Sequence, residues 1–396
     1  MSNSTLKTIP GWLFLMGSLS ALGPLAIDLY LPSFTLIAQG LATTQGDVER
    51  TLATYLLGMG LATLIYGPIT DRFGRRLPIL FGLTVFTTAS VACALTTDIE
   101  HLTAWRFVQA FGGAVGMVIP RAVIRDRLET QDASKAMSLV MLIVGVTPIL
   151  GPPIGGYLLP YVGWRGLFGL MAANGLILLV ASWMTMRESL AHDKKTPLKA
   201  LAIARNYWGL LKDRHFIFYA LSGSFGFAGL FTYISGAPRV IMGVYGIDPD
   251  SFGILFGINA AALILMAQLS ARLLNRFTPD NLLSAAQIFA LLITSAGVVF
   301  TLLGWLDLTF FMICAFSFMA CQGFIFPNSA AMALANQGHR LGVASALMGT
   351  LQMLGGTGAG LAISAWPSDT ALPMTTLLCL CAFLSWLFGR IAFTKT

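Results

Sequence analysis

The chain has 396 residues, of which 56% are hydrophobic and only 10% are charged, and its formal net charge is +7. Soluble globular proteins carry roughly 25% charged residues, so this composition excludes a water-soluble fold and indicates an integral membrane protein. The positive charge does not indicate a nucleic-acid-binding protein, because the Lys and Arg residues lie in short gaps between apolar runs.

Twelve apolar stretches are long enough to be membrane spans, because a helix needs about 20 mostly apolar residues to cross the hydrocarbon core. The first stretch follows Lys7 but contains Asp28 and has no convincing small-residue cleavage site, so we expect an uncleaved span and not a signal peptide. The predicted fold class is an all-α membrane protein with spans near 11–38, 48–69, 77–97, 101–124, 135–159, 163–186, 215–239, 250–273, 281–303, 307–334, 341–364 and 371–391.

The first span contains Asp28, and no other acidic residue lies deep within a predicted span. A charged side chain at the bilayer centre costs about 2.5–3.5 kcal/mol even on the most lenient scale, so its presence indicates a function. A carboxyl group in such a place can take up and release a proton. We therefore expect Asp28 to act in proton coupling or to bind a cationic substrate. The alternative is a carboxylate tied permanently to a partner or hydrated near the interface.

The gap between the second and third spans, residues 67–76, carries four charges in a turn punctuated by glycine. Short loops rich in Lys and Arg stay in the cytoplasm, although an ordinary charged turn that stops translocation is an alternative reading. If both termini are cytoplasmic, the Asp and Glu residues divide evenly between the two faces. All but four of the 24 Lys and Arg residues then lie at or near the cytoplasmic face, the exceptions being Arg50, Arg106, Arg165 and Arg239.

The fourth span contains Arg106, followed by Gln109 on the same side of the helix. If the first span leaves the membrane near Ile37 and the fourth enters near His101, the depths of Asp28 and Arg106 differ by only about 6 Å. An arginine side chain reaches that far, so we predict that Arg106 pairs with Asp28. In the alternative, Arg106 extends to the outer interface.

The fifth span is interrupted by glycine and proline. Proline removes a backbone donor and bends a helix, and glycines three or four residues apart form a flat face for close packing. We expect this helix to lie at the contact between two halves that open and close, although a static kinked helix would have the same sequence. The residues concerned are Gly145, Pro148, Gly151, Pro152, Gly155 and Gly156.

The longest polar gap, from Arg187 to Arg214, separates six spans from six. Part of it, Leu198–Leu211, has helical spacing and basic character, which is typical of a helix on the membrane surface, although a flexible tether fits as well. We predict an N-terminal six-helix bundle, a cytoplasmic linker and a C-terminal six-helix bundle over residues 1–190, 191–213 and 214–396.

The second half contains a counterpart of residues 67–76. The segment Gln268–Phe277 occupies the same place and keeps Arg272 and Arg276, but it lacks the Asp and both glycines. Two repeats of this kind predict a substrate site between the halves, near the bilayer midplane. Polar residues within spans are candidates to line that cavity, although Asn and Gln as often bond a neighbouring helix. The candidates are Tyr30, Tyr55, Gln109, Tyr233, Asn259 and Asn328.

Four motifs together resemble the Bcr/CflA group of drug:proton antiporters in the major facilitator superfamily, the group of the bicyclomycin-resistance proteins. They are Asp28-Leu-Tyr-Leu-Pro32, residues 67–76, Arg106-x-x-Gln109 and Gly151-Pro-Pro-Ile-Gly-Gly156. The resemblance covers nearly the whole chain. It implies a twelve-helix exporter of the bacterial inner membrane that expels drugs in exchange for protons.

The resemblance also implies roles for individual residues. Asp28 would be the membrane-embedded acid and Arg106 the arginine tied to proton coupling, and the six glycine and proline residues of the fifth span would form the antiporter motif. Because no Asp lies beside Arg272, any gate in the second half must be weaker or built differently. The cytoplasmic gate in the first half would contain Gly67, Asp71, Arg72, Gly74, Arg75 and Arg76.

We therefore predict a proton-coupled multidrug efflux antiporter, working by alternating access on small antibiotics of the bicyclomycin, sulfonamide or phenicol kind. It would act as a monomer in the lipid bilayer, with the proton as coupling ion and no other cofactor or metal. A metabolite exporter or an uptake symporter on the same scaffold is the alternative. A receptor or an intramembrane enzyme is disfavoured, because the sequence contains no catalytic set, zinc motif or phosphate-binding loop.

Overall fold

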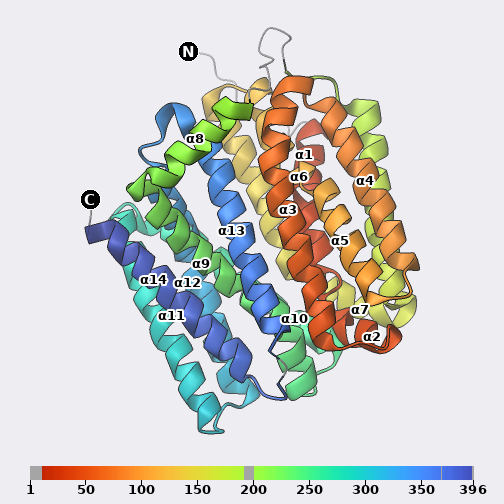
Figure 1. Ribbon diagram of the computed structural model, residues 1–396, viewed down its shortest axis with the longest axis vertical. Coiled ribbons are helices and arrows are strands. Elements are labelled where there is room, and N and C mark those ends of the chain that lie inside the picture. The colour runs from red at the N-terminus through yellow and green to blue at the C-terminus, as the bar shows by residue number, and fades with distance from the viewer. Residues whose placement is uncertain (1–10, 191–199, 367, 395–396) are drawn as a thin grey trace.

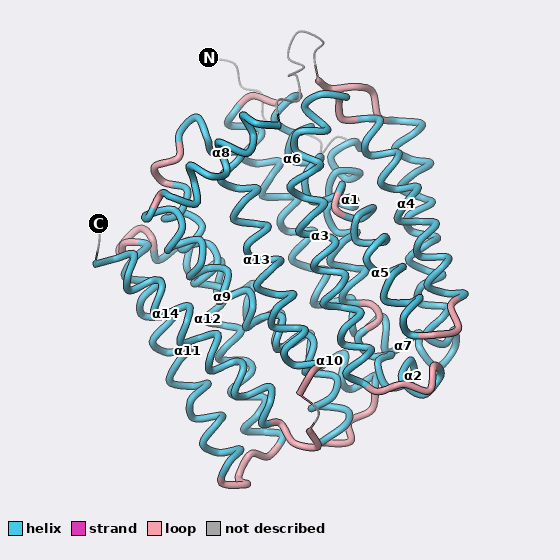
Figure 2. The backbone as a smooth tube through the Cα atoms, viewed as in Figure 1, coloured by secondary structure: helices cyan, strands magenta, loops and turns pink. Residues whose placement is uncertain are grey.

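The computed structural model describes residues 11–190, 200–366 and 368–394, and this part of the chain is all-α, which confirms the predicted fold class (Figures 1 and 2). Short 3₁₀ helices at Leu31–Ser33 and Gly338–Arg340 and a π-helix at Pro238–Val244 connect longer elements. The α-helices are α1 Gly11–Asp28, α2 Phe34–Gly40, α3 Gln45–Phe73, α4 Arg76–Leu95, α5 Ile99–Gly113, α6 Val115–Arg127, α7 Thr130–Thr185, α8 Ala200–Lys212, α9 Arg214–Ala237, α10 Pro249–Leu273, α11 Pro279–Leu302, α12 Leu308–Leu334, α13 Leu341–Ser364 and α14 Leu372–Thr394.

The described residues contain eleven helical segments that are long and apolar enough to cross a membrane. The number is eleven and not twelve because α7 contains both the fifth and the sixth predicted spans. The break between them is at Gly163, whose φ of 66° lies in the left-handed region that favours glycine. The fifth span was predicted to bend at its prolines, but the helix is interrupted at Gly163, after the end of that span. The prolines themselves lie within helical backbone.

The helices form two halves that pack mainly within themselves (Figure 1). In the first half, α1 and α4 pack on α7, and α5 packs on α3 and α4; in the second, α9 packs on α12, α13 and α14, and α10 and α11 pack on α12. Two pairs carry most of the contact between the halves, α3 with α13 and α7 with α10. The helix predicted in the linker forms as α8, while residues 191–199 lie outside the described residues.

Two ends of the molecule carry the loops. We call the end that holds α8 and the turn Phe73–Arg76 the linker face, and the end that holds Gly40–Thr44 and Thr96–Asp98 the distal face. In Figure 1 α8 lies at the top and α2 at the bottom.

The two halves pack most closely towards the distal face. On α13, a methyl group added at Gly360 would lie 3.0 Å from Ala53 Cβ, and one at Gly356 would lie 3.1 Å from Leu56 Cδ1. Nearer the linker face, a methyl group added at Gly67 on α3 would have no neighbour within 4 Å. The contact between α3 and α13 therefore loosens towards the linker face.

The second pair of helices across the halves follows the same trend. A methyl group added at Gly156 on α7 would lie 2.6 Å from the Pro249 carbonyl oxygen on α10, near the distal face. At Gly145, further towards the linker face, the nearest atom is Ile264 Cδ1 at 3.6 Å. Both pairs together describe a conformation that is closed at the distal face.

Candidate functional site

Asp28 is the last residue of α1, and its side chain points into the contact with α7. The residue is 3% exposed. A methyl group added at Gly151 would lie 2.7 Å from Asp28 Cβ, and one at Gly155 would overlap the carbonyl oxygen of Leu29. Because both positions are glycines and carry no side chain, α7 approaches the end of α1 closely. The predicted antiporter motif therefore packs against the predicted membrane-embedded acid.

The carboxyl group of Asp28 has no polar partner within the described part of the chain. None of the hydrogen bonds or ion pairs there reaches it. The predicted pair between Asp28 and Arg106 is therefore wrong for this conformation. Depth along the membrane places the two residues at a similar level, but it does not determine towards which neighbouring helix the Asp28 side chain points. Asp28 faces α7, whereas Arg106 meets the backbone of α1 at Ala26.

Arg106 is fully buried, with 0% of its surface exposed, and it is held by partners other than a carboxylate. Its Nη1 donates hydrogen bonds to the Ala26 carbonyl oxygen at 3.1 Å and to Gln109 Oε1 at 2.6 Å. The guanidinium carbon lies 4.3 Å from the centre of the Tyr30 ring and 4.2 Å from that of Tyr55. Contacts of a cation with ring faces are strongest where water is excluded, so these aromatic rings replace a counter-ion.

Gln109 extends this cluster to two further helices. Its side-chain nitrogen donates to Ser90 Oγ on α4 at 2.7 Å and approaches Met171 Sδ on α7 at 3.7 Å. This arrangement confirms that Arg106 and Gln109 lie on one side of α5. Through α1, α3, α4 and α7, the cluster joins five helices of the first half.

The six candidate cavity residues are placed in separate groups. Tyr30, Tyr55 and Gln109 surround Arg106, while Asn259 donates a 2.6 Å hydrogen bond to Tyr233 in the second half and Asn328 donates one of 2.9 Å to Ser270. Each of the six is 0% exposed. The six side chains are therefore buried among helices of their own half and do not line an open cavity in the described structure, and the amide oxygens of Asn259 and Asn328 have no hydrogen-bond partner there.

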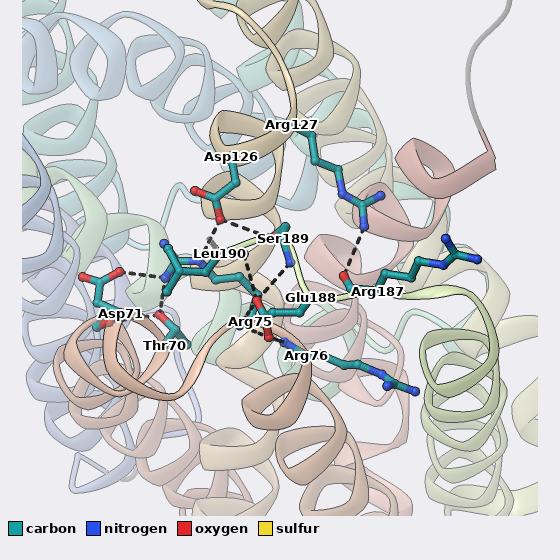
Figure 3. Close-up of polar contacts among 11 residues, drawn as sticks. Thr70, Asp71, Arg75, Arg76, Asp126, Arg127, Arg187, Glu188, Ser189 and Leu190 are labelled. Atoms are coloured by element: carbon teal, nitrogen blue, oxygen red, sulfur yellow. Dashed lines mark hydrogen bonds and ion pairs between the residues drawn. The ribbon is translucent and has the colours of Figure 1, made fainter. Parts of the chain in front are cut away.

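At the linker face, Arg75 is the centre of a polar network (Figure 3). Its Nη1 donates to Asp71 at 2.7 Å and to Thr70 Oγ1 at 3.1 Å, and its Nε donates to Asp126 at 3.0 Å. The side chain is only 7% exposed. Burial alone would lower the pKa of Arg75, but the hydrogen bonds and charges of Asp126 and Asp71 outweigh it and raise the pKa. Arg75 therefore stays charged.

Glu188 joins the network from the segment that follows α7. Its carboxylate accepts the backbone N–H groups of Arg75 at 2.9 Å and Arg76 at 3.2 Å, at the N-terminus of α4, where a negative charge is favourable. Gly74 has a φ of 89°, and a methyl group there would overlap the Glu188 carboxylate. Partial burial raises the pKa of Glu188, but the backbone hydrogen bonds outweigh it and lower the pKa.

Of the six predicted gate residues, Asp71, Gly74, Arg75 and Arg76 take part in this network. Gly67 contributes only its carbonyl oxygen, which accepts a 3.0 Å hydrogen bond from Thr70 Oγ1, and Arg72 makes none of the network contacts in the described structure. Sequence reasoning missed Asp126 and Glu188. The available signal was an isolated acid within basic surroundings, Arg125-Asp126-Arg127 and Arg187-Glu188. All of these residues belong to the first half, so in this conformation the network braces that half.

Comparisons with known proteins agree with this geometry. Residues 14–360 match the family described as Major Facilitator Superfamily. An uncharacterized MFS-type transporter, YdgK of Bacillus subtilis, is 35% identical over 99% of this chain and 97% of its own length. A bicyclomycin resistance protein homolog of Haemophilus influenzae is 31% identical over 93% of each chain. Among solved structures, a bacterial homolog of the human lysosomal transporter Spinster, in an inward-facing and occupied conformation, has a TM-score of 0.74 at 14% identity and covers 97% of this chain and 96% of its own.

Proposed function

The chain belongs to the major facilitator superfamily, and from this premise we propose that it is a proton-coupled drug efflux antiporter of the Bcr/CflA type. Membership makes it a multi-pass membrane transport protein and not an enzyme. The drug substrates are small antibiotics, because one relative with full-length similarity is named as a bicyclomycin resistance protein homolog. The protein works as a monomer and needs no cofactor besides the proton.

The proposed orientation places the linker face in the cytoplasm, with both termini, in the bacterial inner membrane. This orientation is supported by the excess of Lys and Arg at that face. The four cations outside this pattern are all held by other groups. Arg50 pairs with Glu100, Arg165 donates to the Thr96 carbonyl oxygen, Arg239 pairs with Glu49, and Arg106 is buried as described above.

The observation that carries the proposal is the buried carboxyl group of Asp28, which has no polar partner among the described residues. A membrane-embedded acid without a permanent partner is free to exchange a proton for a cationic or hydrogen-bonding group of a drug. In the conformation closed at the distal face, a drug enters from the linker face and competes with the proton at Asp28. After the halves rock, a proton taken up from the distal side favours release of the drug.

The glycines of α7 couple this event to the halves. Gly151 and Gly155 pack against the end of α1, and Gly156 packs against α10 of the other half. A change of charge at Asp28 therefore acts on a helix that contacts both sides of the moving interface. A bias of about 1.4 kcal/mol changes the ratio of two conformations tenfold, so a modest change in interaction is sufficient.

A drug-susceptibility panel in an efflux-deficient host tests the proposal. We expect the chain to raise resistance to at least one of bicyclomycin, chloramphenicol and a sulfonamide, and the Asp28→Asn variant to lose this resistance. Asp369→Asn, at an exposed acid of the distal face, is the matched control and keeps it. Accumulation of the active drug in energised everted vesicles identifies efflux. Uptake in the opposite direction, or full resistance with Asp28→Asn, would overturn the proposal.

A further inference from the structure

One ion pair joins the two halves. Glu49, on the first turns of α3, accepts a 2.7 Å contact from Arg239 Nη2 in the π-helix that continues α9. The Glu49 side chain is 1% exposed and that of Arg239 is 12% exposed. Every other ion pair within the described ranges joins residues of the same half. The pair therefore belongs to the contact between the halves.

Arg239 also reaches the end of α13. Its Nη1 donates a 3.1 Å hydrogen bond to the Trp366 carbonyl oxygen. One turn before Glu49, a methyl group added at Gly46 would lie 2.5 Å from the Ser364 carbonyl oxygen, so α3 and the end of α13 approach at van der Waals distance. The ion pair is thus built into the distal face, where the halves pack most closely.

The two members of the pair differ in chemistry. Arginine keeps its charge at every pH a protein meets, whereas a carboxylate accepts a proton. One oxygen of Glu49, Oε1, is buried without a hydrogen-bond partner in the described structure. A buried charge needs its partner and full hydrogen bonding to be stable, so a half-satisfied carboxylate is poorly protected against protonation.

We propose that Glu49 is a second proton-binding site of this transporter and that it forms, with Arg239, a proton-released latch that closes the distal face. The inference rests on the proposed function. A proton from the distal side binds a Glu49 oxygen and gives the neutral acid, which removes the ion pair with Arg239. Acid at the distal face thus opens the same face from which the drug leaves.

The other charged groups near this end have partners of their own. On α3 itself, Asp47 accepts hydrogen bonds from threonines at the start of the helix, and Arg50 binds Glu100 on α5. From the second half, Arg239 faces Glu49. Neither α2 nor the distal turn of α13 contains a titratable side chain. His101, in the first turn of α5, contacts Asp98 of the same half. Glu49 is the carboxylate of the described ranges that forms an ion pair with the other half, so the response of the contact between the halves is assigned to it.

The latch is tested by the distance between the halves at the distal face. Spin labels are attached at Thr97→Cys in the first half and Thr309→Cys in the second, two exposed positions at that face, after the five native cysteines have been replaced by alanine. Distances are measured by double electron–electron resonance on the full chain in lipid nanodiscs. The pH is lowered from about 8 to about 5, the range in which a perturbed carboxyl group titrates.

We expect the parent to show a short distance at high pH and a longer one at low pH, with a shift of at least about tenfold in the ratio of the two populations. Glu49→Gln shows the longer distance at both ends of the range. Arg239→Gln removes the latch from the other half and gives the same result, so a failure of Glu49→Gln to fold leaves the test intact. Glu100→Gln, in an exposed pair within the first half, is the matched control and behaves as the parent.

The proposal is overturned if the parent distance does not respond to pH, or if Glu49→Gln keeps the parent response. Repeating the measurement with Asp28→Asn separates the two sites. A response that persists in Asp28→Asn assigns it to the latch, whereas one that disappears there and persists in Glu49→Gln assigns it to Asp28 and contradicts the latch. Because no drug is present, the result stands even if the susceptibility panel finds no exported antibiotic.

Discussion

Asp28 and Arg106 are both charged residues buried among the membrane-spanning helices of the first half, and they differ in how they are held. Arg106 has two hydrogen bonds and the faces of two tyrosine rings within 4.3 Å, and it joins α5 to its neighbours. Asp28 has the close approach of Gly151 but no polar partner in the described structure. Only Nη1 of Arg106 donates hydrogen bonds, and Nε and Nη2 are buried without a hydrogen-bond partner in the described structure. The difference indicates that the charge held by Nη1 and by the two rings joins the helices, whereas the charge without a polar partner is available to change its protonation state.

The comparison predicts the largest loss of stability for Arg106→Ala. The substitution leaves a cavity between the two tyrosines and removes the donor to Gln109, so we expect the free energy of unfolding to fall by about 3–5 kcal/mol, as for other large-to-small core changes. Chemical unfolding in detergent measures it, with Arg125→Ala at an exposed position as control. A stability equal to that of the parent would show that the cluster does not hold the bundle.

The next effect concerns the glycines that face α1. Gly155→Ala places a methyl group on the Leu29 carbonyl oxygen, so we expect a loss of about 1–3 kcal/mol from overpacking together with reduced transport. Gly169→Ala is the control on the same helix, because a methyl group there meets no atom within 4 Å. If the two variants had equal stability and transport, the close contact at Asp28 would have no role.

A smaller effect is expected at the linker face. Glu188→Gln keeps the shape of the side chain but removes the charge at the N-terminus of α4, which contributes about 0.3–1 kcal/mol. Because the pKa of Glu188 is lowered from its ordinary value of 4.5, its contribution is present above that value and is lost as the pH falls through the lower pKa of the folded state. Unfolding of the parent and the variant at neutral and acid pH should converge at the acid end. A constant difference would contradict this assignment.

The smallest effect on stability is predicted for Asp28→Asn. The substitution breaks no hydrogen bond or ion pair in the described structure, so we expect no loss beyond about 0.5 kcal/mol, the range of changes that touch no special feature. The measurement is the same unfolding experiment. A loss as large as that of Arg106→Ala would reveal a partner for Asp28 and would remove the contrast between the two charges.

Sequence reasoning predicted the features that depend on composition and on spacing along one helix. The all-α fold and the shared side of Arg106 and Gln109 follow from apolar length and helical periodicity. Pairing between distant segments could not be predicted in the same way. Depth placed Asp28 and Arg106 at one level but left the rotation of α1 undetermined. Glu49 lies at the edge of a predicted span and meets a residue 190 positions away.

The central claim is that Asp28 exchanges protons for drug, and coupled flux in proteoliposomes tests it most directly. Purified protein is reconstituted into vesicles that contain a pH-sensitive dye. The drug of the panel to which the chain gives most resistance is then added outside, which creates an inward drug gradient. The account predicts that drug entering the vesicles drives protons out with the parent protein, and that Asp28→Asn, although stably folded, moves no protons. Proton movement by Asp28→Asn at the rate of the parent would contradict it.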